Sequence, residues 1–344
     1  MTGAINQDAA NLSERILYEV KRVVVGQDAF LERVLIALIA QGHLLVEGVP
    51  GLAKTLTVKT LAQAIGGEFR RIQFTPDLVP ADLVGTRMYN QKTGDFSTTL
   101  GPVFTNLLLA DEINRAPAKV QSALLEVMQE RQVTIAGETH RVPRPFVVMA
   151  TQNPIETEGT YALPEAQVDR FMMKVLVGYP NADEEFVIVQ RVTGAAEAIA
   201  RAASLADLLA MQQVCRDVYV DPALIRYAVR LVAATRDPGS VGLPELRRFI
   251  MLGASPRGSI SLIEGARALA LMRGRRYVLS EDVAALTGDV LRHRLTLSYE
   301  AMSEGVTSDA LIEKLSARLA LPREVLTSPE QATASADMPA RVAA

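Results

Sequence analysis

The first 180 residues alternate short apolar runs with stretches of helical periodicity. Three of the runs, His43–Glu47, Leu107–Asp111 and Phe146–Ala150, are almost wholly apolar and have the length of a strand. Such runs are typical of strands that are buried on both faces of a sheet. The remaining predicted elements are strands over 70–74 and 172–177 and helices over 54–64 and 117–131. This alternation predicts an α/β fold in which helices flank a mostly parallel sheet.

Two insertions interrupt the alternation. The first covers about residues 85–100 and contains the turn sequence Lys92-Thr93-Gly94-Asp95. The second covers about residues 132–145, where two alternating segments flank Gly137-Glu138. We predict a β-hairpin in each insertion.

After Pro180 the strand patterns disappear and amphipathic helical patterns dominate. Asp221-Pro222 and Ser280-Glu281-Asp282 are helix-start signals, because capping side chains and acidic residues favour a helix N-terminus. We therefore predict an α/β domain over residues 1–180 and a smaller all-α domain over 181–327. The last residues, 328–344, are rich in Ala, Ser, Pro and Thr, and we expect a flexible tail.

Composition narrows the class of protein. A length of 344 residues suits about two domains. With 36 basic and 39 acidic residues the net charge is -3, so a nucleic-acid-binding protein is not favoured. The short basic run Arg273–Arg276 is interpreted as solvated surface. The sequence shows no leader and no apolar run of ~20 residues, which predicts a cytoplasmic protein without a membrane span.

Few side chains outside the motifs suggest chemistry. The three histidines, His43, His140 and His293, are far apart in sequence, which argues against a histidine metal site. The single cysteine, Cys215, is interpreted as a small buried hydrophobe and not as a nucleophile.

The strongest motif joins the first predicted strand to the following helix. A loop in this position can bind phosphate through its backbone N–H groups and the helix N-terminus, while a lysine reaches the terminal phosphates. A threonine after that lysine can ligate Mg²⁺. Alanine replaces the usual second glycine at position 53, where a methyl group is acceptable if φ is negative. The candidate nucleotide-binding residues are Gly48, Val49, Pro50, Gly51, Leu52, Ala53, Lys54, Thr55 and Leu56.

Two further strands end in polar side chains. Asp111 and Glu112 follow an apolar strand, where they could hold Mg²⁺ through water and polarise an attacking water molecule. Alone, such a pair could equally be solvated carboxylates, but it lies downstream of a phosphate loop. Asn153 ends the next strand and could hydrogen-bond the terminal phosphate or the water. Asparagine before proline is also a common turn, so this assignment depends on its place in the series.

The order of GVPGLAKT, LLLADEINRAP, MATQNP, LPEAQVDRF and GASPRG resembles the MoxR family of AAA+ ATPases over about residues 15–320. The resemblance implies an ATPase core with a helical lid that assembles into a ring, usually a hexamer, with ATP between subunits. It also implies a chaperone-like remodeller that acts on a client protein, often beside a von Willebrand factor A-domain protein.

The resemblance also implies residue roles. Lys54 and Thr55 occupy the Walker A positions, Asp111 and Glu112 occupy Walker B, and Asn153 is similar to sensor 1. The segment Val24-Val25-Gly26-Gln27 resembles the part of the family that lines the adenine pocket, and the two insertions resemble hairpins that mark this clade.

Three arginines complete the resemblance. Arg170 resembles the arginine finger offered to the neighbouring subunit's ATP, and Arg257 resembles the sensor 2 of the lid. An ion pair of Arg170 with Asp169 or Glu165, or simple exposure of Arg257, would be the structural alternatives. Whether Arg115 also faces the next subunit is open on the sequence alone.

Several function classes share this core. An ATP-driven remodeller is favoured over a nucleotide-gated switch, because a switch could dispense with Glu112 or Arg170. A GTPase is disfavoured because the sequence has no Asn-Lys-x-Asp signature. A nucleic-acid translocase is disfavoured by the acidic balance. A magnesium-chelatase-like motor subunit is separated from a remodeller by the family resemblance alone.

Overall fold

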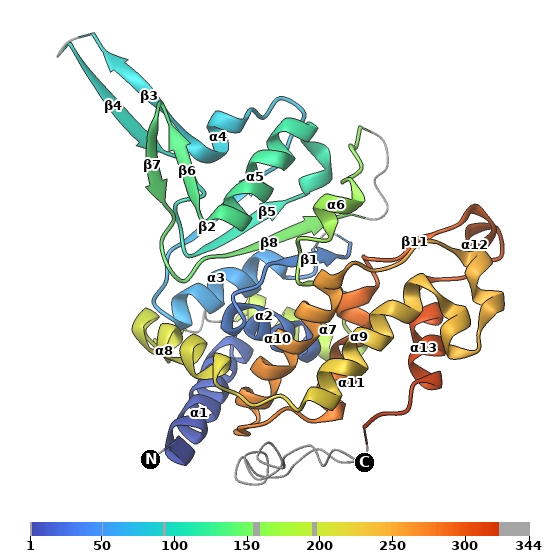
Figure 1. Cartoon of the computed structure of the whole chain (residues 1–344). Helices are drawn as coiled ribbons and strands as arrows, with labels where there is room; N and C mark the ends of the chain where they lie inside the picture. The colour runs from blue at the N-terminus through green and yellow to red at the C-terminus, as the bar shows by residue number, and fades with distance from the viewer. Residues whose placement is uncertain (1, 50, 92–93, 154–158, 195–197, 323–344) are drawn as a thin grey trace, which may run out of the picture.

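The computed structural model describes residues 2–49, 51–91, 94–153, 159–194 and 198–322. Its centre is a five-stranded sheet with the order β2-β5-β8-β1-β9, in which every pair is parallel (Figure 1). The strands are β1 (Leu44–Glu47), β2 (Phe69–Gln73), β5 (Leu107–Asp111), β8 (Val147–Gln152) and β9 (Met173–Leu176). All five predicted strands are therefore confirmed, with ends that move by one or two residues.

Alternate residues of the central strands enter two separate cores. In β5, Leu107 and Leu109 pack into one apolar cluster, whereas Leu108 and Ala110 pack into the other. The same division separates Leu45 from its neighbours in β1. Because successive side chains of a strand point to opposite faces, an uninterrupted apolar run is what a sheet covered on both faces requires.

Helices cover both faces of the sheet (Figure 1). α1 (Thr2–Lys21), α2 (Asp28–Ile39) and α3 (Lys54–Ala64) lie on one face, and α4 (Pro80–Val84) and α5 (Ala118–Glu130) lie on the other. The short helix α6 (Glu165–Val168) precedes β9. Gly66 and Gly67 follow α3, as the predicted helix stop requires, and Gly66 has φ +64°.

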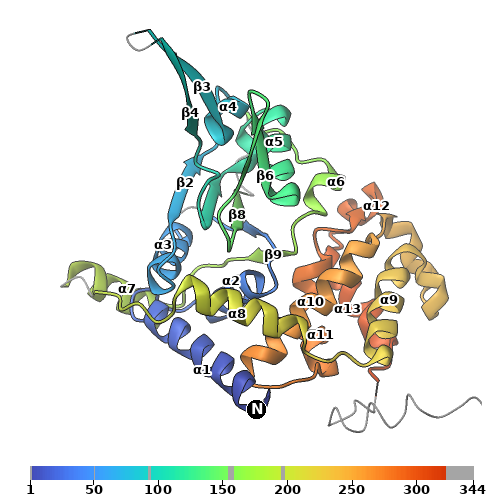
Figure 2. The same ribbon diagram turned by 60° about the vertical axis from the view of Figure 1, so that its left-hand side comes forward.

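Both insertions form antiparallel hairpins, as predicted. The first consists of β3 (Gly85–Asn90) and β4 (Asp95–Leu100), and the second of β6 (Gln132–Ile135) and β7 (Glu138–Arg141). The β3–β4 hairpin projects far from the sheet (Figure 2). It carries the exposed rings of Tyr89 and Phe96, whose centroids are 5.1 Å apart.

The second half of the chain is mainly helical, as predicted. Its α-helices are α7 (Ala182–Thr193), α8 (Leu205–Arg216), α9 (Pro222–Arg236), α10 (Pro256–Met272), α11 (Ser280–Leu291), α12 (Tyr299–Ser303) and α13 (Ser308–Arg318). Two 3-10 turns, Pro238–Val241 and Pro244–Phe249, follow α9, and a further one, Ile113–Arg115, follows β5 in the first half. A short antiparallel pair, β10 (Ile250–Leu252) with β11 (Thr296–Leu297), was not predicted. The apolar stripe along α10 is buried in the core.

One apolar cluster extends from the α1–α3 face of the sheet into these helices without a break. Ala9 near the N-terminus and Leu319 after α13 belong to the same cluster. The boundary placed at residue 180 remains a prediction, and the expected tail over 328–344 lies outside the described residues.

Two polar details differ from expectation or extend it. Arg273 and Arg275 are not merely solvated, because both pair with Asp282, whose side chain is fully buried (3.0 and 2.6 Å). Cys215 is buried as predicted, and burial raises the pKa of its thiol to about 12. Among the described helices, none combines the length and apolar character that crossing a bilayer requires.

Candidate active site

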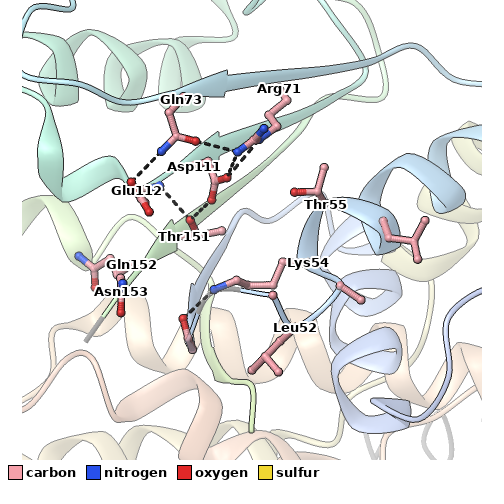
Figure 3. A pocket seen from close by; sticks show the side chains of 14 residues that line it. Leu52, Lys54, Thr55, Arg71, Gln73, Asp111, Glu112, Thr151, Gln152 and Asn153 are labelled. Atoms are coloured by element: carbon pink, nitrogen blue, oxygen red, sulfur yellow. Dashed lines mark hydrogen bonds and ion pairs between the residues drawn. The ribbon is translucent and has the colours of Figure 1, made fainter. Parts of the chain in front are cut away.

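A cavity of about 420 Å³ lies where the carboxyl ends of β1, β5 and β8 meet the start of α3 (Figure 3). Parallel strands place their carboxyl ends at one edge of the sheet, and ligands of α/β proteins bind there. The described residues that line the cavity are Gly48, Gly51, Leu52, Ala53, Lys54, Thr55, Leu56, Arg71, Gln73, Asp111, Glu112, Thr151, Gln152 and Asn153. The cavity thus brings together most of the predicted nucleotide-binding residues.

The loop before α3 has the backbone that a phosphate loop needs. Gly51 has φ +87°, a conformation that favours glycine. Lys54 begins α3 and donates from Nζ to the carbonyl of Gly48 at 2.7 Å. Val49 belongs to the loop but does not line the cavity, and Pro50 lies outside the described residues.

The condition stated for Ala53, a negative φ, is not met. Its φ is +55°, in the left-handed region, so its methyl group is accommodated at a position where glycine would have no steric penalty. The position caps α3, and the carbonyl of Ala53 accepts from the N–H of Thr57 at 2.8 Å. The helix start therefore holds a conformation that alanine alone would not favour.

One hydroxyl orients both carboxylate residues at the end of β5. Thr151 donates from Oγ1 to Asp111 Oδ1 at 2.5 Å and accepts from the backbone N–H of Glu112 at 2.9 Å. Glu112 itself has φ +55°. Non-glycine residues in this region of backbone space store strain and are frequent at active sites. Thr151 was not among the predicted site residues.

Two residues of β2 also enter the site without having been predicted. Arg71 donates from Nη2 and Nε to Asp111 Oδ2 at 2.7 and 3.1 Å. Gln73 accepts from Arg71 at 2.7 Å and donates to Glu112 Oε2 at 2.7 Å (Figure 3). Arg115, which the sequence alone does not place, pairs with Glu112 at 3.0 Å. Both carboxylates are therefore held by cationic or amide partners.

The cavity is electrostatically mixed. Burial lowers the pKa of Lys54, and the carboxylates of Asp111 and Glu112 offset part of this change. Asn153 directly follows β8, lies at the cavity wall and is 7% exposed. An uncharged donor at that position can bind an anion without adding charge.

An apolar recess of about 100 Å³ adjoins the loop. Val25 and Gln27 line it together with Ile188 and Val192 of α7. Gly26 has φ +66°, a conformation that favours glycine, and a Cβ there would lie 2.5 Å from the Glu184 carboxylate, which would have to move. The recess shares Leu52 and Leu56 with the larger cavity. A flat heterocyclic base fits such a lining.

The remaining two predicted arginines lie away from the cavity lining. Arg170 is exposed and donates to the carbonyl of Leu125 at 3.2 Å. Asp169, its expected alternative partner, pairs instead with Arg257 at 3.3 Å and with Arg294 at 2.9 Å. Arg257 lies at the start of α10 with its side chain 49% exposed.

Arg294 forms a buried contact between the two halves of the chain. Its guanidinium donates to Asp169 and to the carbonyls of Phe171 and Met172. Burial lowers the pKa of Arg294 to about 10, and the charge of Asp169 opposes this change. The segment that carries Arg170 is therefore fastened to the helical half.

The donor set fits a triphosphate with Mg²⁺. Thr55 supplies a hydroxyl and Asp111 a carboxylate to the same cavity, and Mg²⁺ prefers such oxygen ligands together with retained water. Lys54 supplies positive charge beside them. Among the described residues, no cluster of three or more His, Cys, Asp and Glu side chains forms a separate metal site.

The fold and this site define a phosphate-loop nucleotide-binding protein with an AAA+ core. Residues 43–173 match the family described as "ATPase family associated with various cellular activities (AAA)", and residues 247–315 match the "AAA lid domain".

Individual proteins narrow the family. The chain is 53% identical to "Chaperone MoxR1" of Mycobacterium tuberculosis over 318 residues, which cover 92% of this chain and 84% of that protein. It is 34% identical to "Protein MoxR" of Paracoccus denitrificans, with 87% and 93% covered. A crystal structure of a Cytophaga hutchinsonii protein superposes on the chain with a TM-score of 0.88 at 46% identity, with 93% of this chain and 98% of that one covered. The chain belongs to the MoxR family of AAA+ ATPases.

Proposed function

We propose that the chain hydrolyses ATP to ADP and phosphate and uses this reaction to remodel partner proteins. The observation that carries the proposal is the shared cavity: Lys54, Thr55, Asp111, Glu112 and Asn153 all line it. A relative named a chaperone supports the remodelling role. The adjoining apolar recess supports a nucleotide over a free phosphate.

Each of these five residues has a role in this proposal. Lys54 leaves the Gly48 carbonyl and neutralises the terminal phosphates. Mg²⁺, held by Thr55 and through water by Asp111, would offset charge on the phosphates. Glu112 orients the attacking water and accepts its proton, and Asn153 donates to the γ-phosphate or to that water.

The cation that completes the site is proposed to come from a neighbouring copy. Phosphoryl transfer develops charge on the equatorial oxygens, and an arginine from outside can raise the rate by about 10³–10⁵. Arg170 is exposed, and Arg257 pairs with Asp169, the residue that precedes Arg170 in the chain. We therefore place both on the surface that meets the next subunit's ATP, in a ring that the family resemblance predicts to be a hexamer.

The β3–β4 hairpin supports action on a protein client. Tyr89 and Phe96 are 55% and 60% exposed at a projecting position, where large apolar side chains are available to an unfolded segment. A von Willebrand factor A-domain protein stays the partner that the family resemblance predicts. The alternative of a nucleotide-gated switch would keep ATP binding but have negligible turnover. A magnesium-chelatase-like motor subunit would share the site and differ in its client.

Mixing two inactive variants tests catalysis between subunits. Lys54→Ala keeps Arg170, and Arg170→Ala keeps Lys54, so some mixed interfaces contain both intact residues. We expect each variant alone to be inactive and the mixture to recover ATPase activity, measured as phosphate release. Mixing Lys54→Ala with the double variant that carries both Lys54→Ala and Arg170→Ala is the matched control, because no subunit then has an intact phosphate loop. No recovery at any ratio, or full activity of wild type that is independent of dilution, would contradict the proposal.

A further inference from the structure

Arg71 is hydrogen-bonded to the carboxylate of Asp111, which the proposed reaction assigns to Mg²⁺ as a ligand through water. Its guanidinium donates twice to Asp111 Oδ2, at 2.7 and 3.1 Å, and both residues line the cavity. The other oxygen of Asp111, Oδ1, already accepts from Thr151. Because Oδ2 accepts two hydrogen bonds from Arg71, a hydrated cation that binds this oxygen would have to displace the guanidinium.

The Arg71 side chain can be displaced. It is 48% exposed, whereas Asp111 is only 17% exposed. Its strand, β2, is an edge strand, and among the described residues it pairs with β5 alone. Thr151 is buried and bonded on both sides. Arg71 is therefore the partner of Asp111 that can move at small cost.

We propose that Arg71 is a positioning residue that neutralises Asp111 until Mg²⁺ takes this place, and that Arg71 thereby sets how strongly ATP binding depends on Mg²⁺. The inference rests on the proposed function, because it takes the cavity as the triphosphate site. When Arg71 leaves Asp111 it also loses its contact with Gln73, the residue that donates to Glu112. Binding of Mg²⁺ at Asp111 would therefore also change the contacts of Gln73, the residue that donates to Glu112.

Removal of the guanidinium should affect ATP binding differently with and without metal. Without metal, Arg71→Gln leaves the Asp111 charge facing the triphosphate, so ATP binds more weakly than in wild type. With metal, no ion pair has to be broken, so ATP binds as tightly as in wild type or more tightly. The ratio of the ATP dissociation constant in EDTA to that in saturating MgCl₂ should rise by about tenfold or more, as expected for loss of charge-assisted hydrogen bonds.

The experiment is calorimetric titration of ATP into the full chain, in EDTA and at a series of MgCl₂ concentrations. Arg70→Gln is the matched control, because Arg70 is the adjacent arginine of β2 and pairs with Glu68 outside the cavity. Arg71→Lys keeps a positive charge without the fork and should give an intermediate ratio. Circular dichroism checks that each variant is folded.

Two results would overturn the proposal. A ratio for Arg71→Gln equal to that of Arg70→Gln would show that Arg71 does not compete with the metal. Equal weakening of ATP in both conditions would identify Arg71 as a direct phosphate ligand. If wild type binds no ATP in either condition, the nucleotide site itself is wrong, which is a different outcome from failure of Arg71 alone.

Discussion

Acidification should destabilise the protein through His43, which joins three elements of the α/β core. Its Nδ1 accepts from the N–H of Val148 at 3.0 Å, so Nε2 carries the proton donated to the carbonyl of Met128 at 3.1 Å. The ring is therefore neutral. Burial and, to a smaller extent, the charge of Arg131 lower its pKa to about 4, although the hydrogen bond to Met128 opposes this change.

The magnitude follows from the difference between folded and unfolded states. The pKa of His43 is about 4 in the folded chain, against 6.5 for a solvated histidine, a difference of about 2.5. At about 1.4 kcal/mol for each tenfold change in proton affinity, this corresponds to about 3 kcal/mol. Because the folded pKa is the lower one, the unfolded chain binds the proton first as the pH falls. The contribution of His43 to the free energy of unfolding is therefore fully present well above pH 6.5, and it is lost progressively as the pH falls to about 4.

Urea unfolding at pH 7 and pH 5 measures this contribution. Wild type should lose about 2 kcal/mol more between these two pH values than His43→Gln, whatever the variant's stability at pH 7. Carboxylates and His293, whose pKa burial also lowers, contribute to both proteins and cancel in the comparison. His140→Gln, on the β6–β7 hairpin, controls for loss of a histidine outside this contact. Equal pH dependence in wild type and His43→Gln would refute the reasoning.

Two further variants test the site. Glu112→Gln should bind ATP with near wild-type affinity yet lose at least about 100-fold in turnover, since it removes the proton acceptor; normal phosphate release would mean that the base is another residue, and slow turnover in wild type would favour the switch. Ala53→Gly should leave the free energy of unfolding unchanged or raise it by up to about 1 kcal/mol, because φ is +55° at this position. The control Ala123→Gly, inside α5, should cost about 1 kcal/mol, and equal losses in both would show that position 53 is not strained.

The sequence predicts the sheet and the strand ends well because both depend on local patterns. The apolar run Leu107–Asp111 coincides with β5, since burial on both faces requires such a run. The polar residues that end β5 and β8 then meet because parallel strands share one carboxyl edge. Topology alone therefore brings Lys54, Asp111 and Asn153 to one cavity.

The missed features depend on contacts between distant segments. Arg71 and Thr151 each bond to Asp111 from a neighbouring strand, 40 residues away in the chain, and no local pattern distinguishes them. One signal for Arg71 is the pair of arginines inside a short strand, where a charge needs a partner. The β10–β11 pair has strands of three and two residues, too short for a period of two to be recognised.

The position of β2 in the sheet has a consequence for how the site changes when it fills. Asp111 and Asn153 extend from strands with a neighbour on each side, which form a fixed wall. Arg71 and Gln73 stand on the edge strand β2, which is paired on one side in the part of the chain that the structure describes. Side-chain rearrangement on ligand binding should thus be concentrated on the β2 side of the cavity. The side chains at the ends of β5 and β8 should keep their positions.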